Sequence, residues 1–146
     1  DGWKQVTSEL AIERAGPERF LSTTIILEEA VRAMAETDDD RICIAFGQLV
    51  ARLRTLRRMS LGVSALLQEG SSPETEAALV KEVGTRFERE IIEGVRSLVP
   101  SQPKTQGMSD YQSVLRDGIL HIPSSTIRGG TNEVLKGIVA RQLGLR

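Results

Sequence analysis

The fold of this chain is decided by residues 39–68, DDRICIAFGQLVARLRTLRRMSLGVSALLQ, where apolar side chains recur three and four positions apart over many turns. Such a pattern is typical of an amphipathic α-helix, which at ~1.5 Å per residue would span about 45 Å. Asp39 and Asp40 favour a helix start there, because carboxylates stabilise the positive end of a helix. The apolar face consists of Ile42, Phe46, Leu49, Val50, Leu53, Leu56, Met59, Val63, Leu66 and Leu67.

Helical patterns also flank this stretch. Residues 3–35 are predicted to be helical, with a kink or break at Gly16-Pro17, because a proline removes a backbone hydrogen bond and clashes with the preceding turn. Residues 69–73, Glu-Gly-Ser-Ser-Pro, combine a helix stop with a cap and a helix start. They predict a third helix from about residue 73 to residue 98.

The remaining residues are less regular. Residues 100–107 are polar and rich in prolines, and read as a surface loop. A short helical turn is expected within residues 108–120, and a final helix after Thr131 and Asn132, which can cap it. We therefore expect one all-α domain over residues 1–146, a four-helix bundle of the up-down type with a long loop before the last helix. No strand is expected.

Composition argues against several classes of function. Lys and Arg number 19 against 20 acidic residues, so the overall charge points to neither nucleic acid nor an acidic ligand. One basic strip nevertheless leaves two interpretations open, a solvated helix face paired with nearby acids or a helical module that binds nucleic acid. The strip consists of Arg52, Arg54, Arg57 and Arg58.

Cysteine and histidine are equally scarce. Cys43 is the one cysteine, so an internal disulfide is excluded, and its apolar neighbours predict a buried thiol. His121 is the one histidine, so no histidine-based metal cluster is expected. There is no apolar run of membrane-spanning length, and a cytoplasmic location without membrane contact is expected. Because the chain begins with Asp1 rather than Met, we expect it to be a piece of a longer protein.

The last twenty residues contain the strongest functional signal. Gly129 and Gly130 precede Thr131 and an apolar helical pattern, which describes either a plain helix cap or a loop whose backbone N–H groups face a ligand. The segment resembles the closing segment of the acyl-CoA dehydrogenases, which often end in Gly-Gly-Thr-Asn-Glu-Ile and Ala-Arg-x-x-Leu-Gly-Leu. The matching residues are Gly129, Gly130, Thr131, Asn132, Glu133, Val134, Ala140, Arg141, Leu143, Gly144 and Leu145.

This resemblance covers essentially the whole chain but only the C-terminal helical domain of that family, so N-terminal helical and middle β domains are expected elsewhere. It implies an FAD-dependent α,β-dehydrogenation of an acyl-CoA thioester, with an electron-transfer flavoprotein or another acceptor as partner. It also implies a homo- or hetero-oligomer formed through the helical bundle. The fragment alone is expected to fold without holding FAD tightly or turning over.

The resemblance also implies roles for particular residues. The family places its catalytic glutamate either in the final loop, where Gly129 stands here, or near the start of the first helix, where Glu13 stands. Glu13 is therefore the expected base, with Arg14 beside it supporting the hydrogen bonds and charge of the site. The alternative for these two residues is an ordinary exposed ion pair on an amphipathic helix.

The final loop supplies the other expected site residues. The backbone N–H of Gly129 is expected to bond the thioester carbonyl. Gly130, Thr131 and Glu133 match positions close to the flavin, although Glu133 is also a favourable first-turn carboxylate in any helix. Arg128 replaces an apolar or aromatic residue at the substrate end of the pocket.

Two family elements are missing from the sequence. These are the Arg-x-x-Phe-Gly element, which reaches the flavin of a neighbouring subunit, and the Gln-x-x-Gly-Gly segment before the final loop. Their absence fits a divergent branch that binds bulky acyl groups or pairs two unlike subunits. A non-catalytic partner subunit of a heteromeric acyl-CoA dehydrogenase is therefore the alternative function.

Overall fold

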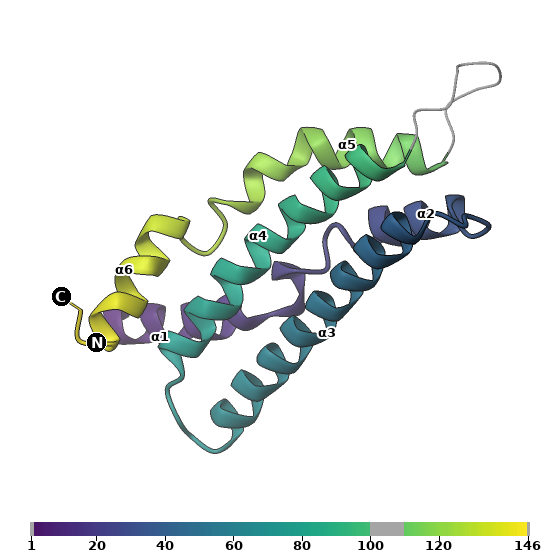
Figure 1. Cartoon of the computed structure of the whole chain (residues 1–146). Coiled ribbons are helices and arrows are strands. Elements are labelled where there is room, and N and C mark those ends of the chain that lie inside the picture. The colour runs from purple at the N-terminus through teal and green to yellow at the C-terminus, as the bar shows by residue number, and fades with distance from the viewer. Residues whose placement is uncertain (1, 100–109, 146) are drawn as a thin grey trace.

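A computed structural model describes residues 2–99 and 110–145, and all regular structure in these residues is helical (Figure 1). The all-α class is therefore confirmed. In chain order the elements are α1 (Gly2–Ala15), the 3₁₀ turn η1 (Pro17–Arg19), α2 (Thr24–Ala33), α3 (Asp40–Gln68), α4 (Glu74–Leu98), α5 (Asp110–Ser125) and α6 (Asn132–Gln142).

The break predicted at Gly16-Pro17 is confirmed. Helix α1 ends at Ala15, and Pro17 opens η1, whose short turn includes a hydrogen bond from the Arg19 N–H to the Gly16 carbonyl at 3.1 Å. Phe20, which follows η1, is 1% exposed and anchors this turn in the core. The predicted single helical region is thus two helices joined by a turn, with the chain redirected directly after Glu13 and Arg14.

Helix α3 begins and ends as predicted. The Asp39 carboxylate caps it by accepting a hydrogen bond from the Arg41 N–H at 2.9 Å, and Leu56 and Val63 are among its most deeply buried side chains. The prediction that Cys43 is buried is wrong, because adjacent residues of a helix point in different directions: Ile42 is buried, whereas the Cys43 thiol is exposed. Val50, assigned to the apolar face, is also exposed.

The basic strip lies on the exposed side of α3. Its four arginines are exposed, and Arg52 forms an ion pair with Glu90 of α4. This pairing agrees with the interpretation of the strip as a solvated face with acidic neighbours. Among the helices of residues 2–99 and 110–145, none is long and apolar enough to cross a membrane.

Helix α4 is the centre of the fold. It packs against α1, α2, α3, α5, α6 and η1, and in Figure 1 it runs between α3 on one side and α5 and α6 on the other. Its side chains at Ala77, Phe87, Ile91 and Val95 are at most 2% exposed. Because every other element contacts α4, its side chains determine where the site residues of α1 and of the α5–α6 loop lie.

Gly84 allows η1 to approach α4 closely, which predicts a measurable loss of stability for Gly84→Ala. An added methyl group would lie 2.6 Å from the Arg19 carbonyl oxygen, so the backbone must shift. We expect a destabilisation on the order of 1–3 kcal/mol in urea unfolding. Gly62→Ala on α3 is the matched control, because nothing lies within 4 Å of an added methyl group and alanine favours the helix. Equal effects of the two substitutions would contradict this explanation.

Helix α5 is longer than the short helical turn predicted for residues 108–120. It spans 16 residues and contains Pro123 in its last turn. Tyr111 and Leu115 are buried against the core, and this packing stabilises a helix whose local sequence is rich in helix-breaking signals. The loop predicted at residues 100–107 lies outside the described residues.

Candidate functional site

The loop between α5 and α6 is built on two glycines in left-handed backbone conformations. Gly129 has a φ of 65° and Gly130 a φ of 105°, values that side chains of other residues rarely allow. The loop ends at Thr131, whose hydroxyl accepts a hydrogen bond from the Val134 N–H at 3.5 Å and caps α6 as predicted. The glycine pair therefore turns the chain sharply just before the positive end of a helix.

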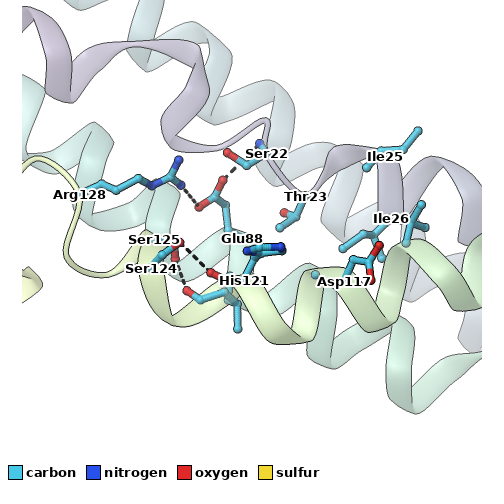
Figure 2. Close-up of a pocket in the computed structure, with 13 residues that line it drawn as sticks. Ser22, Thr23, Ile25, Ile26, Glu88, Asp117, His121, Ser124, Ser125 and Arg128 are labelled. Atoms are coloured by element: carbon cyan, nitrogen blue, oxygen red, sulfur yellow. Dashed lines mark hydrogen bonds and ion pairs between the residues drawn. The ribbon is translucent and has the colours of Figure 1, made fainter.

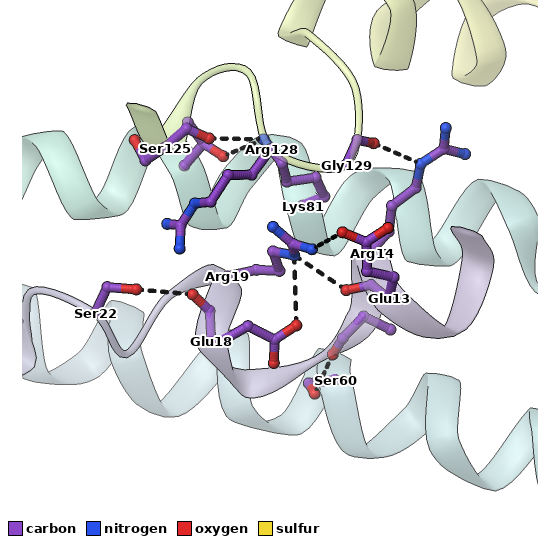
Figure 3. Close-up of polar contacts among 12 residues, drawn as sticks. Glu13, Arg14, Glu18, Arg19, Ser22, Ser60, Lys81, Ser125, Arg128 and Gly129 are labelled. Atoms are coloured by element: carbon purple, nitrogen blue, oxygen red, sulfur yellow. Dashed lines mark hydrogen bonds and ion pairs between the residues drawn. The ribbon is translucent and has the colours of Figure 1, made fainter. Parts of the chain in front are cut away.

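Arg14 connects this loop to α1. Its side chain is 8% exposed, and its Nε donates a hydrogen bond to the Gly129 carbonyl at 3.0 Å (Figure 3). Burial is the main influence on the guanidinium and lowers the pKa of Arg14, while Glu13 and Glu74 act in the opposite direction. Arg14 therefore holds in place a loop that is 115 residues away in the sequence.

Glu13 lies directly against the same loop. A methyl group at Gly129 would be 3.6 Å from Glu13 Oε1 and 3.5 Å from Arg19 Nη2, so the carboxylate faces the glycine. The Glu13 side chain is 46% exposed, which leaves it open to an incoming group. The structure thus brings together Glu13, Arg14 and Gly129, the three residues for which the sequence predicted catalytic roles.

Arg19 is a member of this cluster that sequence reasoning missed. It is 5% exposed, it forms ion pairs with the carboxylates of Glu13 and Glu18, and its Nε donates to the Glu13 carbonyl at 3.0 Å. The available signal was the Gly-Pro break, since a tight turn after α1 folds residue 19 back onto the end of that helix. Arg19 consequently holds the Glu13 side chain beside the loop (Figure 3).

Lys81 lies beneath the loop and was also missed. It is fully buried on α4, and its Nζ donates to Thr85 Oγ1 at 2.8 Å and to the Ser125 carbonyl at 3.1 Å. Burial, followed by the nearby charges of Arg19, Arg128 and Arg14, lowers the pKa of Lys81 to about 8, with Glu88 opposing the shift. The second bond anchors the C-terminal end of α5, from which the glycine loop departs.

The sequence contains a signal for the burial of Lys81 and Glu88. Lys81 and Glu88 follow Ala77 at helical spacing and precede Ile91 and Val95 on the same side of α4. Charged residues within an otherwise apolar face indicate buried polar contacts, because burying an unpaired charge is costly.

Glu88 connects α4 to Arg128 and to the segment before α2. The Glu88 carboxylate is buried, lies 3.3 Å from Arg128 Nη2 and accepts a hydrogen bond from the Ser22 N–H at 3.2 Å. Burial raises the pKa of Glu88, and the contacts with Ser22, Arg128 and Lys81 oppose this rise. Arg128, expected at the substrate end, therefore has a buried anionic partner at the edge of a pocket (Figure 2).

Comparison with known proteins assigns the chain to a family. The family model described as acyl-CoA dehydrogenase, C-terminal domain, matches residues 1–144. This chain belongs to the acyl-CoA dehydrogenase C-terminal domain family. The resemblance found in the sequence is confirmed.

A solved structure has the same fold as this acyl-CoA dehydrogenase C-terminal domain. It is a variant of a protein described as the Tcur3481–Tcur3483 steroid ACAD, with a TM-score of 0.74 and 21% sequence identity. The match covers 98% of this chain and 39% of that one, so the chain spans less than half of the solved protein. A search of curated protein sequences gave no match.

The residues expected near the flavin lie together in this acyl-CoA dehydrogenase domain. A methyl group at Gly130 would be 3.6 Å from Arg14 Nη2, Thr131 caps α6, and Glu133 is exposed in the first turn of that helix. Hydrogen bonds from its own backbone N–H and from Thr131 lower the pKa of Glu133. In the part of the chain that the structure describes, no group of acidic, cysteine and histidine side chains could hold a metal ion.

The same helix start fits a polar cofactor edge. Among the residues that the structure describes, the buried Asn132 Oδ1 atom has no hydrogen-bond partner, which is costly unless a ligand or water supplies a donor. It follows directly on the glycine pair and Thr131, where backbone and hydroxyl groups are also concentrated. This arrangement is compatible with the hydrogen-bonding edge of a flavin.

Proposed function

We propose that this chain is the C-terminal domain of an FAD-dependent acyl-CoA dehydrogenase that removes hydrogen from the α and β carbons of an acyl-CoA thioester. Residues 1–146 would then be one domain of a longer subunit whose N-terminal helical and middle β domains lie elsewhere. The observation that carries the proposal is the position of the Glu13 carboxylate, 3.6 Å from where a side chain at Gly129 would begin.

In this proposal Glu13 is the base. The α-carbon C–H bond breaks, its proton moves to a carboxylate oxygen of Glu13, and the C–H electron pair becomes part of the new α,β double bond. FAD, when bound, would supply the acceptor for the hydride that leaves the β carbon. Removing a proton from such a weak carbon acid requires a carboxylate held at the α carbon, and Arg19 would hold Glu13 there because it binds both the side chain and the backbone carbonyl of Glu13.

Gly129 would polarise the substrate. A backbone N–H bonded to the thioester carbonyl stabilises the negative charge that develops as the α proton leaves. Arg14 would support this role, because its hydrogen bond to the Gly129 carbonyl holds that residue in place. A larger residue at position 129 would bring its side chain against Glu13 and Arg19.

The α6 start would face the cofactor, with Gly130, Thr131 and Glu133 beside the flavin. The substrate class would be a lipid or sterol side chain esterified to CoA, a suggestion supported by the description of the solved relative as a steroid ACAD. An electron-transfer flavoprotein or another acceptor would reoxidise the flavin. Helices of this bundle would form the contacts of a homo- or hetero-oligomer.

One observation favours a second candidate, a non-catalytic partner subunit of a heteromeric acyl-CoA dehydrogenase. The Glu13 carboxylate is paired through Oε1 with the buried Arg19 guanidinium, so its position can be explained without a catalytic role. In a partner subunit the same ion pair would simply stabilise the junction of α1 and η1.

Anaerobic flavin reduction by the full-length protein tests the proposal. The flavin absorbance is followed after mixing with straight-chain, branched and steroid acyl-CoAs, and bleaching by any of them establishes the reaction. A full-length protein that binds FAD and is not bleached by any member of the panel contradicts it. A subunit that binds no FAD, yet is required for the activity of a second subunit, supports the partner role instead.

A further inference from the structure

Charged side chains from α1 and α4 hold the loop between α5 and α6 at three points. Each of these side chains belongs to a residue that is at most 8% exposed, and each contacts a different residue of the segment 125–129. Two of the contacts are hydrogen bonds to backbone carbonyls, and the third is an ion pair between side chains. The three contacts are Lys81 with Ser125, Arg14 with Gly129, and Glu88 with Arg128.

The Glu88 carboxylate joins two segments that are far apart in the sequence (Figure 2). Its Oε1 accepts a hydrogen bond from the Ser22 N–H at 3.2 Å, and its Oε2 accepts one from Arg128 Nη2 at 3.3 Å. Glu88 is 1% exposed, whereas the Arg128 side chain is 38% exposed. Because an unpaired buried carboxylate is strongly disfavoured, this ion pair fixes the Arg128 side chain against α4.

Arg128 has few other attachments. In the part of the chain that the structure describes, its side chain forms one hydrogen bond, the one to Glu88, and its buried Nε has no partner. Removing the negative charge of Glu88 would therefore release the Arg128 guanidinium.

The attachment of Arg128 matters because two glycines follow it. Gly129 and Gly130 have φ values of 65° and 105°, and without side chains they contribute no contacts that would hold this backbone. The peptide group between Arg128 and Gly129 contains the N–H that would bond the thioester carbonyl. Arg14 holds the peptide group on the other side of Gly129, through its carbonyl. The orientation of the Gly129 N–H thus depends on where Arg128 is held.

We propose that Glu88 is a positioning residue of the dehydrogenase site, which orients the Gly129 N–H toward the thioester carbonyl by holding Arg128. Glu88 itself would touch neither the substrate nor the flavin. This inference rests on the proposed function, because it takes the Gly129 N–H as the donor to the thioester.

Glu88→Gln in the full-length holoenzyme tests the role of the charge. Glutamine keeps the size of the side chain and an acceptor for the Ser22 N–H, but it removes the charge that pairs with Arg128. We expect anaerobic flavin reduction at saturating acyl-CoA to slow about 10- to 100-fold. The Kd of a CoA thioether, which lacks the carbonyl, should change little.

Glu82→Gln is the matched control. Glu82 is also buried on α4 and pairs with Arg86 at 2.7 Å, but it lines a different pocket, beside α3. This variant should retain flavin reduction within a few-fold.

The carbonyl stretch of a bound thioester reports the hydrogen bond itself. The probe is an α,α-dimethylacyl-CoA with an isotope-labelled carbonyl, which has no α proton and therefore cannot react. A hydrogen bond polarises the carbonyl and lowers its stretching frequency. In infrared difference spectra, the frequency should be higher in Glu88→Gln than in the wild type and in Glu82→Gln. A merely structural contribution of Glu88 would lower thermal stability without this shift.

A double-mutant cycle assigns the effect to Arg128. Arg128→Met breaks the same contact from the loop side and should raise the carbonyl frequency in the same direction, which keeps the test decisive if Glu88→Gln does not fold. In the Arg128→Met background, Glu88→Gln should slow flavin reduction little further, because the two residues act through one contact. An equal effect in both backgrounds would mean that Glu88 acts through Ser22 or the core, and would overturn the inference.

The outcomes also separate this inference from the function on which it rests. A wild-type flavin that no acyl-CoA bleaches contradicts the dehydrogenase function, and this inference with it. If the wild type is bleached, an unchanged rate or an unchanged carbonyl frequency in Glu88→Gln overturns the positioning role alone.

Discussion

Glu13→Gln is expected to slow flavin reduction by acyl-CoA about 10²- to 10⁴-fold in the full-length protein, the range typical for loss of a general base. Glutamine has the shape of glutamate but cannot accept the α proton. The fold should survive, because Arg19 still donates to the Glu13 backbone carbonyl and still pairs with Glu18. Stopped-flow absorbance under anaerobic conditions measures the rate, and FAD content and thermal unfolding report the integrity of the protein.

Glu18→Gln is the matched control for this substitution. It also removes one carboxylate from Arg19, whose Nε lies 3.5 Å from Glu18 Oε1, but Glu18 is not among the groups against Gly129. We expect the control to retain flavin reduction within a few-fold. If Glu13→Gln and Glu18→Gln behave alike, Glu13 is not the base, and the partner-subunit interpretation gains support.

The buried Lys81 predicts that stability increases with pH in the mildly alkaline range. Its pKa is about 8 in the folded protein against an ordinary value of 10.5, so the unfolded chain binds more protons between these values. Stability therefore rises as pH increases through this window. We expect a gain of about 2 kcal/mol between about pH 7.5 and about pH 9.5, measured by urea unfolding at each pH.

Lys81→Met identifies the source of this effect. Methionine fills a similar volume without a titrating group, so the rise in stability across the same window should disappear. The measurement should stop below about pH 10, because burial raises the pKa of Tyr111 and the unfolded chain would release that proton first, with the opposite effect on stability. A wild-type stability that is flat or falls across the window would show that Lys81 keeps its ordinary pKa.

The fold could be predicted wherever local pattern and packing agree. The long apolar repeat of α3, the Asp39 cap and the Gly16-Pro17 break are all properties of neighbouring residues, and the structure contains each of them. Helix α5 was underestimated because its local sequence argues against a helix, while Tyr111 and Leu115 bury their side chains against the core. The apolar sequence neighbours of Cys43 also predicted a buried thiol, whereas the structure leaves it exposed.

Part of the candidate site could also be predicted from the sequence, but through motif resemblance rather than local pattern. Motif resemblance selected Glu13, Arg14 and Gly129, and the structure brings these residues into one cluster. Their roles remain predictions. Arg19 and Lys81 carry no motif of their own, since their importance arises from contacts with η1, α1 and the end of α5.

The sequence by itself determined the helical class, the helix starts and stops at Asp39 and Gly16-Pro17, and the glycine pair that requires left-handed backbone. These features depend on interactions within a few residues, which the order of amino acids specifies directly. Only the tertiary structure decided that Arg14 holds Gly129, that Glu88 joins Arg128, and that Lys81 donates to the Ser125 carbonyl at the end of α5. Those features depend on how helices distant in the chain pack around α4, and burial there decides which charges must find partners.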